Sequence, residues 1–267
     1  MKFRHTLVAA SLAALAFASA AASAATVQIN FIHGFWENAV PPPPDTTIVN
    51  SSPTSTISWG VPAAPNTQQS AYQFTAPPGL TVSINVPVPG DSGNVQFGTF
   101  AHLNFPIFTP FLQSVNLHVT ADIVVDGVDE GVKDFFASFQ HDETPNGGSP
   151  GGPFTGTCPF PVAGSPNGIG INDNGCADRV LVTTITGGDT FTVNGVTYTL
   201  SFSGFSQDNG ATVSNTFFTE ENNTNIAGLF AKVVATQIPT APEPGSLALV
   251  GLAALGVAGA LRRKSTK

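Results

Sequence analysis

The stretch Phe191-Thr-Val-Asn-Gly-Val-Thr-Tyr-Thr-Leu-Ser-Phe202 decides the fold of this chain. Asn194 and Gly195 form a dipeptide that readily takes positive φ at both central positions of a type I′ turn. A two-residue loop then places Phe191 opposite Tyr198, on the face that carries the other apolar residues of the stretch. Turn chemistry and hydrophobic register agree, so the segment predicts an antiparallel hairpin with one buried face.

The same pattern recurs along the chain. Apolar and mostly polar residues alternate over 115–125, and Asp126-Gly127 supplies a turn before a strand over 128–140. Further strands are predicted over residues 81–88, 95–100, 179–186, 213–219 and 229–237. A helix over 227–235 is disfavoured by its valines and its central glycine. Eight or more strands separated by Gly, Pro and Asn turns predict an all-β fold, an antiparallel β-sandwich of jelly-roll type.

The aromatic residues are expected to fill the core of this sandwich. The chain contains 21 Phe but only 2 Trp and 2 Tyr. Phenylalanine brings apolar area without a polar group that needs a partner, whereas sugar-stacking surfaces rely on Trp and Tyr. The composition therefore disfavours a broad aromatic platform for carbohydrate.

Residues 241–267 have the composition of a membrane-sorting signal. An uncharged run over 246–261 spans ~24 Å as a helix at ~1.5 Å per residue, which is less than the ~30 Å hydrocarbon core. This favours a transient anchor over a permanent one. The run follows a Pro-Glu-Pro element and precedes a basic tail over 262–267: Pro242, Glu243 and Pro244, then Arg262, Arg263 and Lys264.

These three parts, in this order, resemble the PEP-CTERM sorting signal of Gram-negative envelope proteins, which are substrates of exosortase membrane proteases. The resemblance implies export across the inner membrane, transient insertion of the C-terminal helix and cleavage near the Pro-Glu-Pro element. Release or transfer to the cell surface or the extracellular matrix would follow. An ordinary C-terminal anchor is the alternative, and neither interpretation implies an activity.

The N-terminus resembles a secretory signal peptide. Lys2 and Arg4 precede an Ala-rich apolar stretch, and Ala22-Ser-Ala24 has the small-residue spacing that signal peptidase reads. We expect cleavage after Ala24 or one residue later, although a retained anchor is the alternative. The chain is then expected to comprise a signal peptide over 1–24, a β-sandwich domain over 25–240 and a sorting signal over 241–267.

The predicted domain is strongly acidic. Over 25–240 it has three cations, Lys133, Arg179 and Lys232, against sixteen Asp and Glu residues, which gives a net charge of −13. Nucleic-acid binding needs a basic surface that replaces counterions, and this domain has none. Anionic membrane surfaces would repel it for the same reason. A cation or a neutral glycan is the expected counterpart.

The two cysteines, Cys158 and Cys176, lie in the exported region and are expected to form a disulfide. Closing a loop of this length is worth ~3 kcal/mol in the chain-entropy treatment. Free thiols are one alternative. A zinc site is the other, but two cysteines need histidines to complete it and His141 alone lies near them in sequence.

Four phrases resemble the choice-of-anchor K type of bacterial surface domain, over most of residues 30–234. The resemblance implies an extracellular β-rich domain upstream of differing anchoring signals, without enzyme activity. At Ala101 the family pattern usually has Thr. The phrases are Ile57-Ser-Trp-Gly60, Phe97-Gly-Thr-Phe-Ala-His-Leu-Asn-Phe-Pro-Ile107, Phe139-Gln-His-Asp-Glu-Thr-Pro-Asn146 and the hairpin stretch continued to Phe205.

Two histidines fall in these phrases. An imidazole such as His141, which precedes Asp142 and Glu143, has the chemistry to bind a metal or transfer protons. No third ligand is defined by spacing, so the sequence favours a structural role. We expect His102 and Asn104 to bond loop backbone at a strand end, and the two acids to be solvated turn residues.

Two acid-rich segments suggest calcium more than catalysis, because calcium takes six to eight oxygens from irregular loops. Neither has EF-hand spacing, and solvated turns remain the favoured interpretation. Calcium is thus the one cofactor that the sequence suggests, if there is any. The candidate ligands are Asp122, Asp126, Asp129, Glu130 and Asp134 on one hairpin, and Asp173 and Asp178 in a second segment.

The sequence favours a non-enzymatic protein, since it has no Gly-x-Ser-x-Gly elbow, His-Glu-x-x-His motif or P-loop. A glycoside hydrolase needs only two carboxylates at the right separation, for example Glu37 and Glu143, but nothing selects that pair. We expect an exported structural or adhesive component of an exopolysaccharide matrix, with which exosortase systems are associated. A calcium-dependent glycan-binding module is the alternative, and a polysaccharide hydrolase is less favoured.

Overall fold

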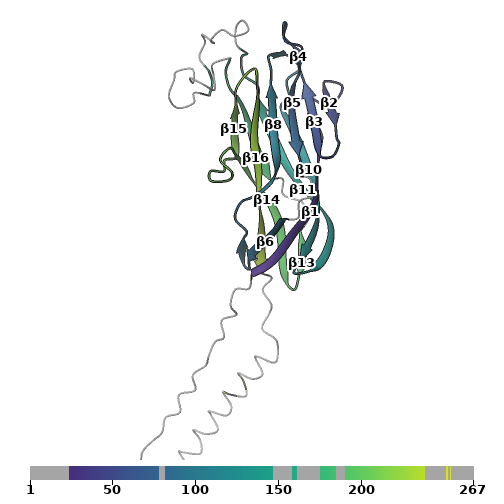
Figure 1. Cartoon of the computed structure of the whole chain (residues 1–267), viewed down its shortest axis with the longest axis vertical. Helices are drawn as coiled ribbons and strands as arrows, with labels where there is room; N and C mark the ends of the chain where they lie inside the picture. Colours follow the sequence, from purple (N-terminus) through teal and green to yellow (C-terminus); the bar gives the residue numbers. More distant parts are fainter. Residues whose placement is uncertain are drawn as a thin grey trace, which may run out of the picture.

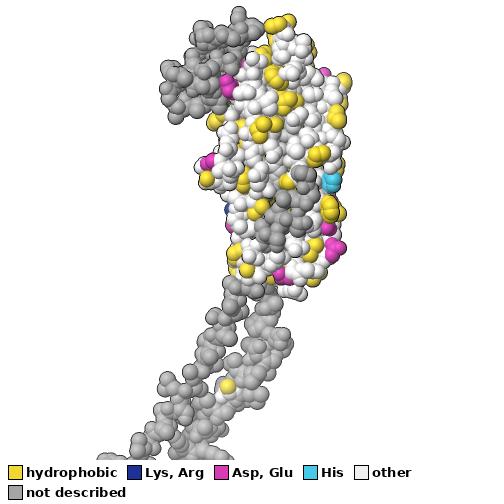
Figure 2. Space-filling view, viewed as in Figure 1, with side chains coloured by type: hydrophobic (Ala, Val, Ile, Leu, Met, Phe, Trp, Pro, Cys, Tyr) yellow, Lys and Arg dark blue, Asp and Glu magenta, His cyan; other side chains and the backbone are white. Residues whose placement is uncertain are grey.

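The computed structural model describes residues 24–77, 82–146, 158–160, 175–184 and 190–237, together with Gly251 and Ala253. Sixteen β-strands form in these residues, and most assemble into two antiparallel sheets that face each other in an elongated sandwich (Figure 1). The predicted all-β sandwich is confirmed. Figure 2 shows one face of it, on which charged side chains are sparse and scattered.

In spatial order, the six-stranded sheet contains β15 (Thr216–Thr219), β12 (Asp178–Thr184), β11 (Val128–Asp142), β10 (Ser114–Val125), β1 (Ala24–Val40) and β6 (Val82–Pro87). The eight-stranded sheet contains β13 (Phe191–Val193), β14 (Val196–Ser206), β16 (Asn223–Gln237), β8 (Val95–Asn104), β5 (Ser70–Thr75), β3 (Thr54–Trp59) and β2 (Thr46–Val49), with β7 (Gly90–Asp91) beside β16. A short ribbon pairs β4 (Val61–Pro62) with β9 (Ile107–Phe108).

The hairpin of β13 and β14 forms as predicted. Asn194 has a φ of 50° and Gly195 a φ of 76°, so both turn residues adopt the left-handed conformation that this turn requires. Phe191 pairs with Tyr198, and both side chains are buried. The second predicted turn, over 126–127, also has positive φ at both positions and joins β10 to β11.

Aromatic rings connect the two sheets. Phe100 of β8 stacks on Phe139 of β11 across the sandwich, with ring centroids 5.3 Å apart. Trp36 of β1 meets the edge of Phe139 at the same distance, 5.3 Å, and its indole N–H donates to the carbonyl of Ser55. All three rings are almost completely buried, which confirms the predicted aromatic core.

The longest strand, β1, was not among the predicted strands. Its pairing with β10 is irregular between Asn30 and His33 and again between Glu37 and Val40. Within these irregular segments, Phe31 and Asn38 adopt positive φ, at 48° and 53°. Each irregularity shifts the alternation of buried and exposed side chains, so a period of two does not run through the strand.

The two ends of the sandwich differ. Strand β1 begins and β16 ends at one end, whereas β8, β11 and β15 finish at the other, where β12 begins (Figure 1). The predicted disulfide between Cys158 and Cys176 is confirmed, with the Cα atoms 5.2 Å apart. Cys176 lies two residues before β12, so the disulfide tethers the chain at the end far from Ala24 and Gln237.

Candidate functional site

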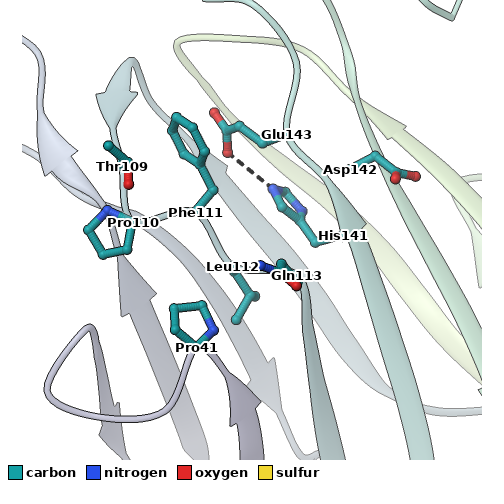
Figure 3. Close-up of a pocket in the computed structure, with 9 residues that line it drawn as sticks. All are labelled: Pro41, Thr109, Pro110, Phe111, Leu112, Gln113, His141, Asp142 and Glu143. Atoms are coloured by element: carbon teal, nitrogen blue, oxygen red, sulfur yellow. Dashed lines mark hydrogen bonds and ion pairs between the residues drawn. The ribbon is translucent and has the colours of Figure 1, made fainter.

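A pocket of about 470 Å³ opens beside the end of β11 (Figure 3). Its walls come from three segments: Pro41, residues 109–113 and residues 141–143. His141 and Glu143 face the pocket and contact each other, while Asp142 lies on the other side of the strand (Figure 3). Behind these two side chains lies a larger buried polar cluster.

We call this group the inner cluster, and it joins both sheets. One histidine comes from β8 and the other from β11, one carboxylate comes from the start of β12, and two more come from the residue after β11 and the turn between β15 and β16. Their side chains are buried or nearly so. The members are His102, His141, Asp178, Glu143 and Glu221.

Strand alternation explains why these polar groups point inward. On β8, Phe100 faces the core, and His102 and Asn104 continue the same buried row. On β11, Phe139 faces the core and His141 follows it two residues later. The two aromatic rows meet between the sheets, so the histidines that extend them also meet.

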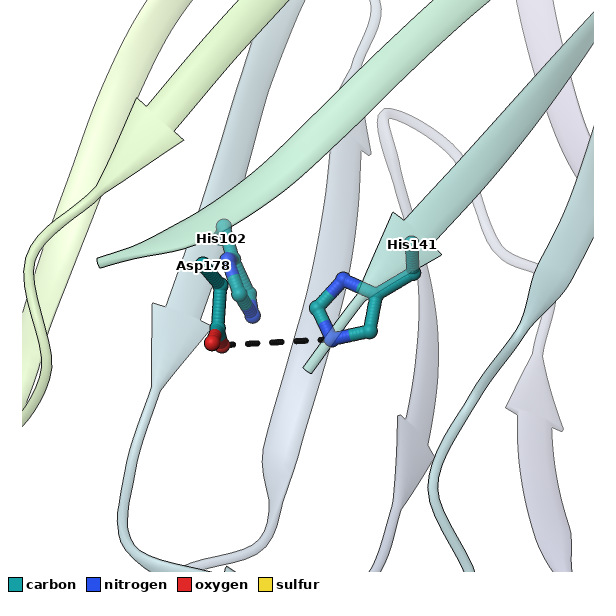
Figure 4. A group of neighbouring side chains, drawn as sticks. All are labelled: His102, His141 and Asp178. Atoms are coloured by element: carbon teal, nitrogen blue, oxygen red, sulfur yellow. Dashed lines mark ion pairs between the residues drawn. The ribbon is translucent and has the colours of Figure 1, made fainter. Parts of the chain in front are cut away.

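The two imidazoles are fixed through their Nδ1 atoms. His102 Nδ1 lies 2.8 Å from the hydroxyl of Thr219, and His141 Nδ1 lies 2.5 Å from the hydroxyl of Tyr72. The rings are nearly perpendicular, with centroids 5.2 Å apart. The Nε2 atom of His141 is therefore left to face the carboxylates, 3.2 Å from Glu143 Oε2 and 3.9 Å from an oxygen of Asp178 (Figure 4).

Asp178 is held through one of its two oxygens. The backbone N–H of Thr144 donates to Asp178 Oδ1 at 2.7 Å, and the hydroxyl of Thr144 donates to the carbonyl of Cys176, also at 2.7 Å. The disulfide segment thus positions the carboxylate. The second oxygen, Oδ2, makes no hydrogen bond to the described residues.

Further atoms of the inner cluster also have no hydrogen-bond partner among the described residues. They are His102 Nε2, Glu143 Oε1 and both carboxylate oxygens of Glu221. A buried polar atom without a partner costs about 1–3 kcal/mol, and more when the group is charged. Several such atoms in one place are typical of a ligand site rather than of a structural core.

Burial is the main cause of the raised pKa values of the carboxylic acids in the inner cluster. It raises the pKa of Glu143 and of Asp178 to about 8, and the pKa of Glu221 to about 9. The negative charge of neighbouring carboxylates raises the pKa of Asp178 and Glu221 further. The indole N–H of Trp59 acts in the opposite direction on Glu143, although it does not reach hydrogen-bond geometry.

The pKa values of the two histidines are shifted in the opposite direction. Burial lowers the pKa of His102 well below its ordinary value, and the neighbouring His141 lowers it further. Burial also lowers the pKa of His141, against the opposing effect of Asp178 and Asp142. Both imidazoles are consequently neutral at pH 7, and a neutral imidazole has a free lone pair on one ring nitrogen.

The structure corrects two of the contacts expected for this region, while the role of the residues stays a prediction. His102 bonds the side chain of Thr219 instead of loop backbone, and Glu143 is buried instead of solvated. Only Asp142 behaves as a surface residue, because it accepts hydrogen bonds from Arg179 at 2.7 Å. Asn104 does reach backbone, donating to the carbonyl of Thr219 at 3.4 Å.

The calcium candidates are only partly brought together. Asp178 belongs to the inner cluster, and Asp173 lies outside the described residues. On the β10–β11 hairpin, Asp126 accepts the N–H of Thr26 and Asp129 accepts the N–H of Gly131, each at 2.8 Å. Within the described ranges, the groups of three potential ligands within 4.8 Å do not include Asp122, Asp126, Asp129, Glu130 or Asp134.

The carboxylates suggested for glycoside hydrolysis lie on different faces of the six-stranded sheet. Glu37 lies 3.7 Å from His118 on the outer face, whereas Glu143 belongs to the inner cluster. A retaining or inverting mechanism requires both groups to flank one bond. The structure does not bring these two together.

The sorting elements lie almost entirely outside the described residues. This applies to Ala22, to Pro242, Glu243 and Pro244, to the basic residues Arg262, Arg263 and Lys264, and to the run over 246–261 apart from Gly251 and Ala253. Ala24 is the first residue of β1 and pairs with Pro87. A helix with the length and apolarity to cross a membrane does not occur in the described part of the chain.

Comparison with protein families identifies the C-terminal segment. Residues 240–264 match the PEP-CTERM protein-sorting motif. No curated protein matched the sequence. The match includes the Pro-Glu-Pro element and the basic cluster, while the resemblance of 30–234 to a choice-of-anchor K domain stays a prediction. The described domain is all-β, and the motif that follows it supports an exported, surface-associated protein and implies processing by exosortase.

Proposed function

We propose that the mature protein is a non-enzymatic structural or adhesive component of an extracellular polysaccharide matrix. The PEP-CTERM motif over 240–264 carries this proposal, because exosortase systems are associated with exopolysaccharide production. The motif supplies the route to the cell exterior. The β-sandwich then supplies the part that works there.

The surface of the sandwich supports contact with a neutral, hydrated polymer. Charged residues make up 10% of the chain, and the face shown in Figure 2 has few of them. The predicted domain over 25–240 carries three cations against sixteen acids, so it would repel a polyanion. A neutral or weakly charged polysaccharide avoids that repulsion.

The placement of the two ends supports an adhesive role. Ala24 and Gln237 lie at one end of the long axis, and the β4–β9 ribbon lies at the other (Figure 1). At that far tip Val61, Phe108 and Phe111 are exposed. A tail that leaves from Gln237 would therefore present these apolar side chains outward during sorting.

The proposal is tested in the native host by fractionation. A strain that lacks the gene is complemented with the wild type or with a variant in which Pro242, Glu243 and Pro244 are all replaced by Ala. The wild type should be recovered from the matrix fraction without its C-terminal segment. The variant should remain with the membrane fraction as the uncleaved chain.

Polysaccharide dependence separates the proposal from its alternatives. Enzymatic digestion of the matrix, or a host that makes no polysaccharide, should release the mature protein into the medium. Retention on the cells in both cases would contradict a matrix role. Release of sugar from the purified polysaccharide by the protein would show a hydrolase, and binding to glycans only with added calcium would show the calcium-dependent module.

A further inference from the structure

We propose that the inner cluster, His102, His141, Glu143, Asp178 and Glu221, binds a divalent transition-metal ion of the zinc or manganese class. No sorting or matrix function requires this site, so the proposal is independent of the proposed function. It rests on the positions of the ligand atoms, on their missing partners, on the groups that orient them and on an adjoining pocket.

The ligand atoms form two groups of three that share Asp178. His102, His141 and Asp178 each offer an atom within 4.8 Å of the others, and Glu143, Asp178 and Glu221 do the same. Two ligands at ~2.0–2.2 Å from zinc can lie at most ~4.4 Å apart. The distances from His141 Nε2 to Glu143 and Asp178, 3.2 Å and 3.9 Å, already satisfy this limit.

The atoms that face one another are those without other partners. His102 Nε2 and Asp178 Oδ2 are fully buried and make no hydrogen bond to the described residues, and both oxygens of Glu221 are in the same condition. Leaving these groups unpaired is costly, whereas a metal ion satisfies them together.

Three of the five ligands are already oriented by a hydrogen bond through their other polar atom. Thr219 fixes His102 Nδ1, Tyr72 fixes His141 Nδ1, and the N–H of Thr144 fixes Asp178 Oδ1. Metal-binding histidines usually use one ring nitrogen for the ion and the other for such an orienting partner. The cluster has this organisation around both imidazoles.

A pocket lies directly beside the cluster. His141 and Glu143 belong to the cluster and also line the pocket of about 470 Å³ (Figure 3). The remaining ligands lie behind them between the sheets. The pocket thus adjoins the cluster at Glu143, whose side chain is 7% exposed, while the His141 side chain is fully buried.

The donor set selects the class of metal. Two imidazole nitrogens with carboxylate oxygens suit zinc, manganese or ferrous iron, whereas calcium and magnesium prefer oxygen ligands alone. Three carboxylates also offset the charge of a divalent ion in a buried site. Because the ligands come from β8, β11, β12 and the β15–β16 turn, the ion would cross-link both sheets at the end far from Ala24.

Metal content and stability test the proposal on mature protein purified from its host without chelator. Elemental analysis should find zinc or manganese in a near-stoichiometric amount. Removal with EDTA should lower the melting temperature, and added ZnCl2 or MnCl2 should restore it while CaCl2 should not. Absence of bound metal together with unchanged melting in all three salts would overturn the proposal.

Matched variants place the ion. His102→Gln and Glu221→Gln preserve side-chain size and should lower affinity by at least tenfold, and Tyr72→Phe should lower it by ~10–100-fold through loss of the orienting partner. His118→Gln changes a surface histidine and should bind like the wild type. Equal affinity in all four proteins would show that the ion binds elsewhere, and restoration by calcium alone would show an oxygen-ligand site.

Discussion

Two histidines on neighbouring strands of one sheet show how burial changes the role of the same chemistry. His118 of β10 lies on the outer face, 2.6 Å from Asp134, and these side chains are 24% and 46% exposed. His141 of β11 lies on the inner face, 3.2 Å from Glu143, and the corresponding values are 0% and 7%. Water can solvate the first pair, which we call the outer pair, whereas the second depends on its protein neighbours.

The difference is energetic as well as geometric. An exposed ion pair contributes about 0–1 kcal/mol, because water already solvates both charges and salt screens them. A buried charge has no such alternative and must be neutralised, hydrogen-bonded or bound to a metal. The outer pair can therefore be lost without consequence for the fold, while the inner cluster couples the fold to protons and metal ions.

The largest contrast is expected between two aspartate substitutions. In the metal-bound protein, Asp178→Ala removes the charged carboxylate shared by both ligand groups and leaves the N–H of Thr144 without its acceptor, so we expect a loss of about 3–5 kcal/mol. Asp134→Ala removes the outer partner of His118 and should cost at most about 1 kcal/mol. Urea denaturation of both variants measures the difference, and equal losses would refute the comparison.

A dependence on pH should come from the inner cluster in the metal-free protein. The pKa values of Glu143 and Asp178 are raised to about 8, and that of Glu221 to about 9, so the folded state holds protons that the unfolded state releases near pH 4. The contribution of these three acids to stability is complete below about pH 4. It is lost as the pH rises toward about 9, at up to ~1.4 kcal/mol per pH unit for each group. Tyr72 faces these acids and stays neutral, because its pKa is raised. The lowered pKa of His102 and of His141 opposes the slope below about pH 6.5, where these histidines gain protons mainly in the unfolded state.

Bound metal should reverse this dependence of stability on pH, because the ion binds the deprotonated ligands and its affinity rises as they lose their protons. Melting curves between pH 5 and pH 9, with EDTA or with zinc, provide the measurement. The variant His118→Gln should follow the wild type in both series. A metal-free melting temperature that rises between pH 6.5 and pH 9 would contradict the assignment of the protons.

The disulfide should support the inner cluster but not the outer pair. Cys176 accepts a hydrogen bond from Thr144, which also holds Asp178, so Cys158→Ser should lower stability by about 3 kcal/mol and weaken metal binding. The outer pair has no such link to Cys176. A stability loss without any change in metal affinity would show that the tether and the cluster act independently.

Local sequence patterns predicted the hairpins but not the cluster. At Asn194 and Gly195 one dipeptide sets the turn, the register and the buried face, because all three depend on neighbouring residues. In β1 the bulges at Phe31 and Asn38 hide the alternation, so the strand was missed. The sorting motif could be recognised from the sequence because its parts follow one another within a short stretch of the chain.

The cluster depends on pairings between distant strands. Alternation from Phe100 to His102, and from Phe139 to His141, could have placed both histidines inward. It could not show that the two rows meet, since that follows from how the two sheets pack against each other. Glu221 reaches the site from a turn whose position depends on β15 pairing with β12, and no local signal marks that contact.

The smallest effect is expected at the hydroxyl of Tyr72. Tyr72→Phe keeps the ring between Trp36 and Phe100 but removes the partner of His141 Nδ1, so a buried imidazole nitrogen loses its hydrogen bond. We expect a cost of about 1–3 kcal/mol in the metal-bound protein. Tyr198→Phe on β14 is the matched control: its ring is buried, but its hydroxyl makes no hydrogen bond to the described residues, so its removal should change stability by about 0.5 kcal/mol or less. Because Tyr72 orients a ligand without being one, its loss should reduce metal affinity and leave stoichiometry unchanged, whereas a purely packing role would leave both unchanged.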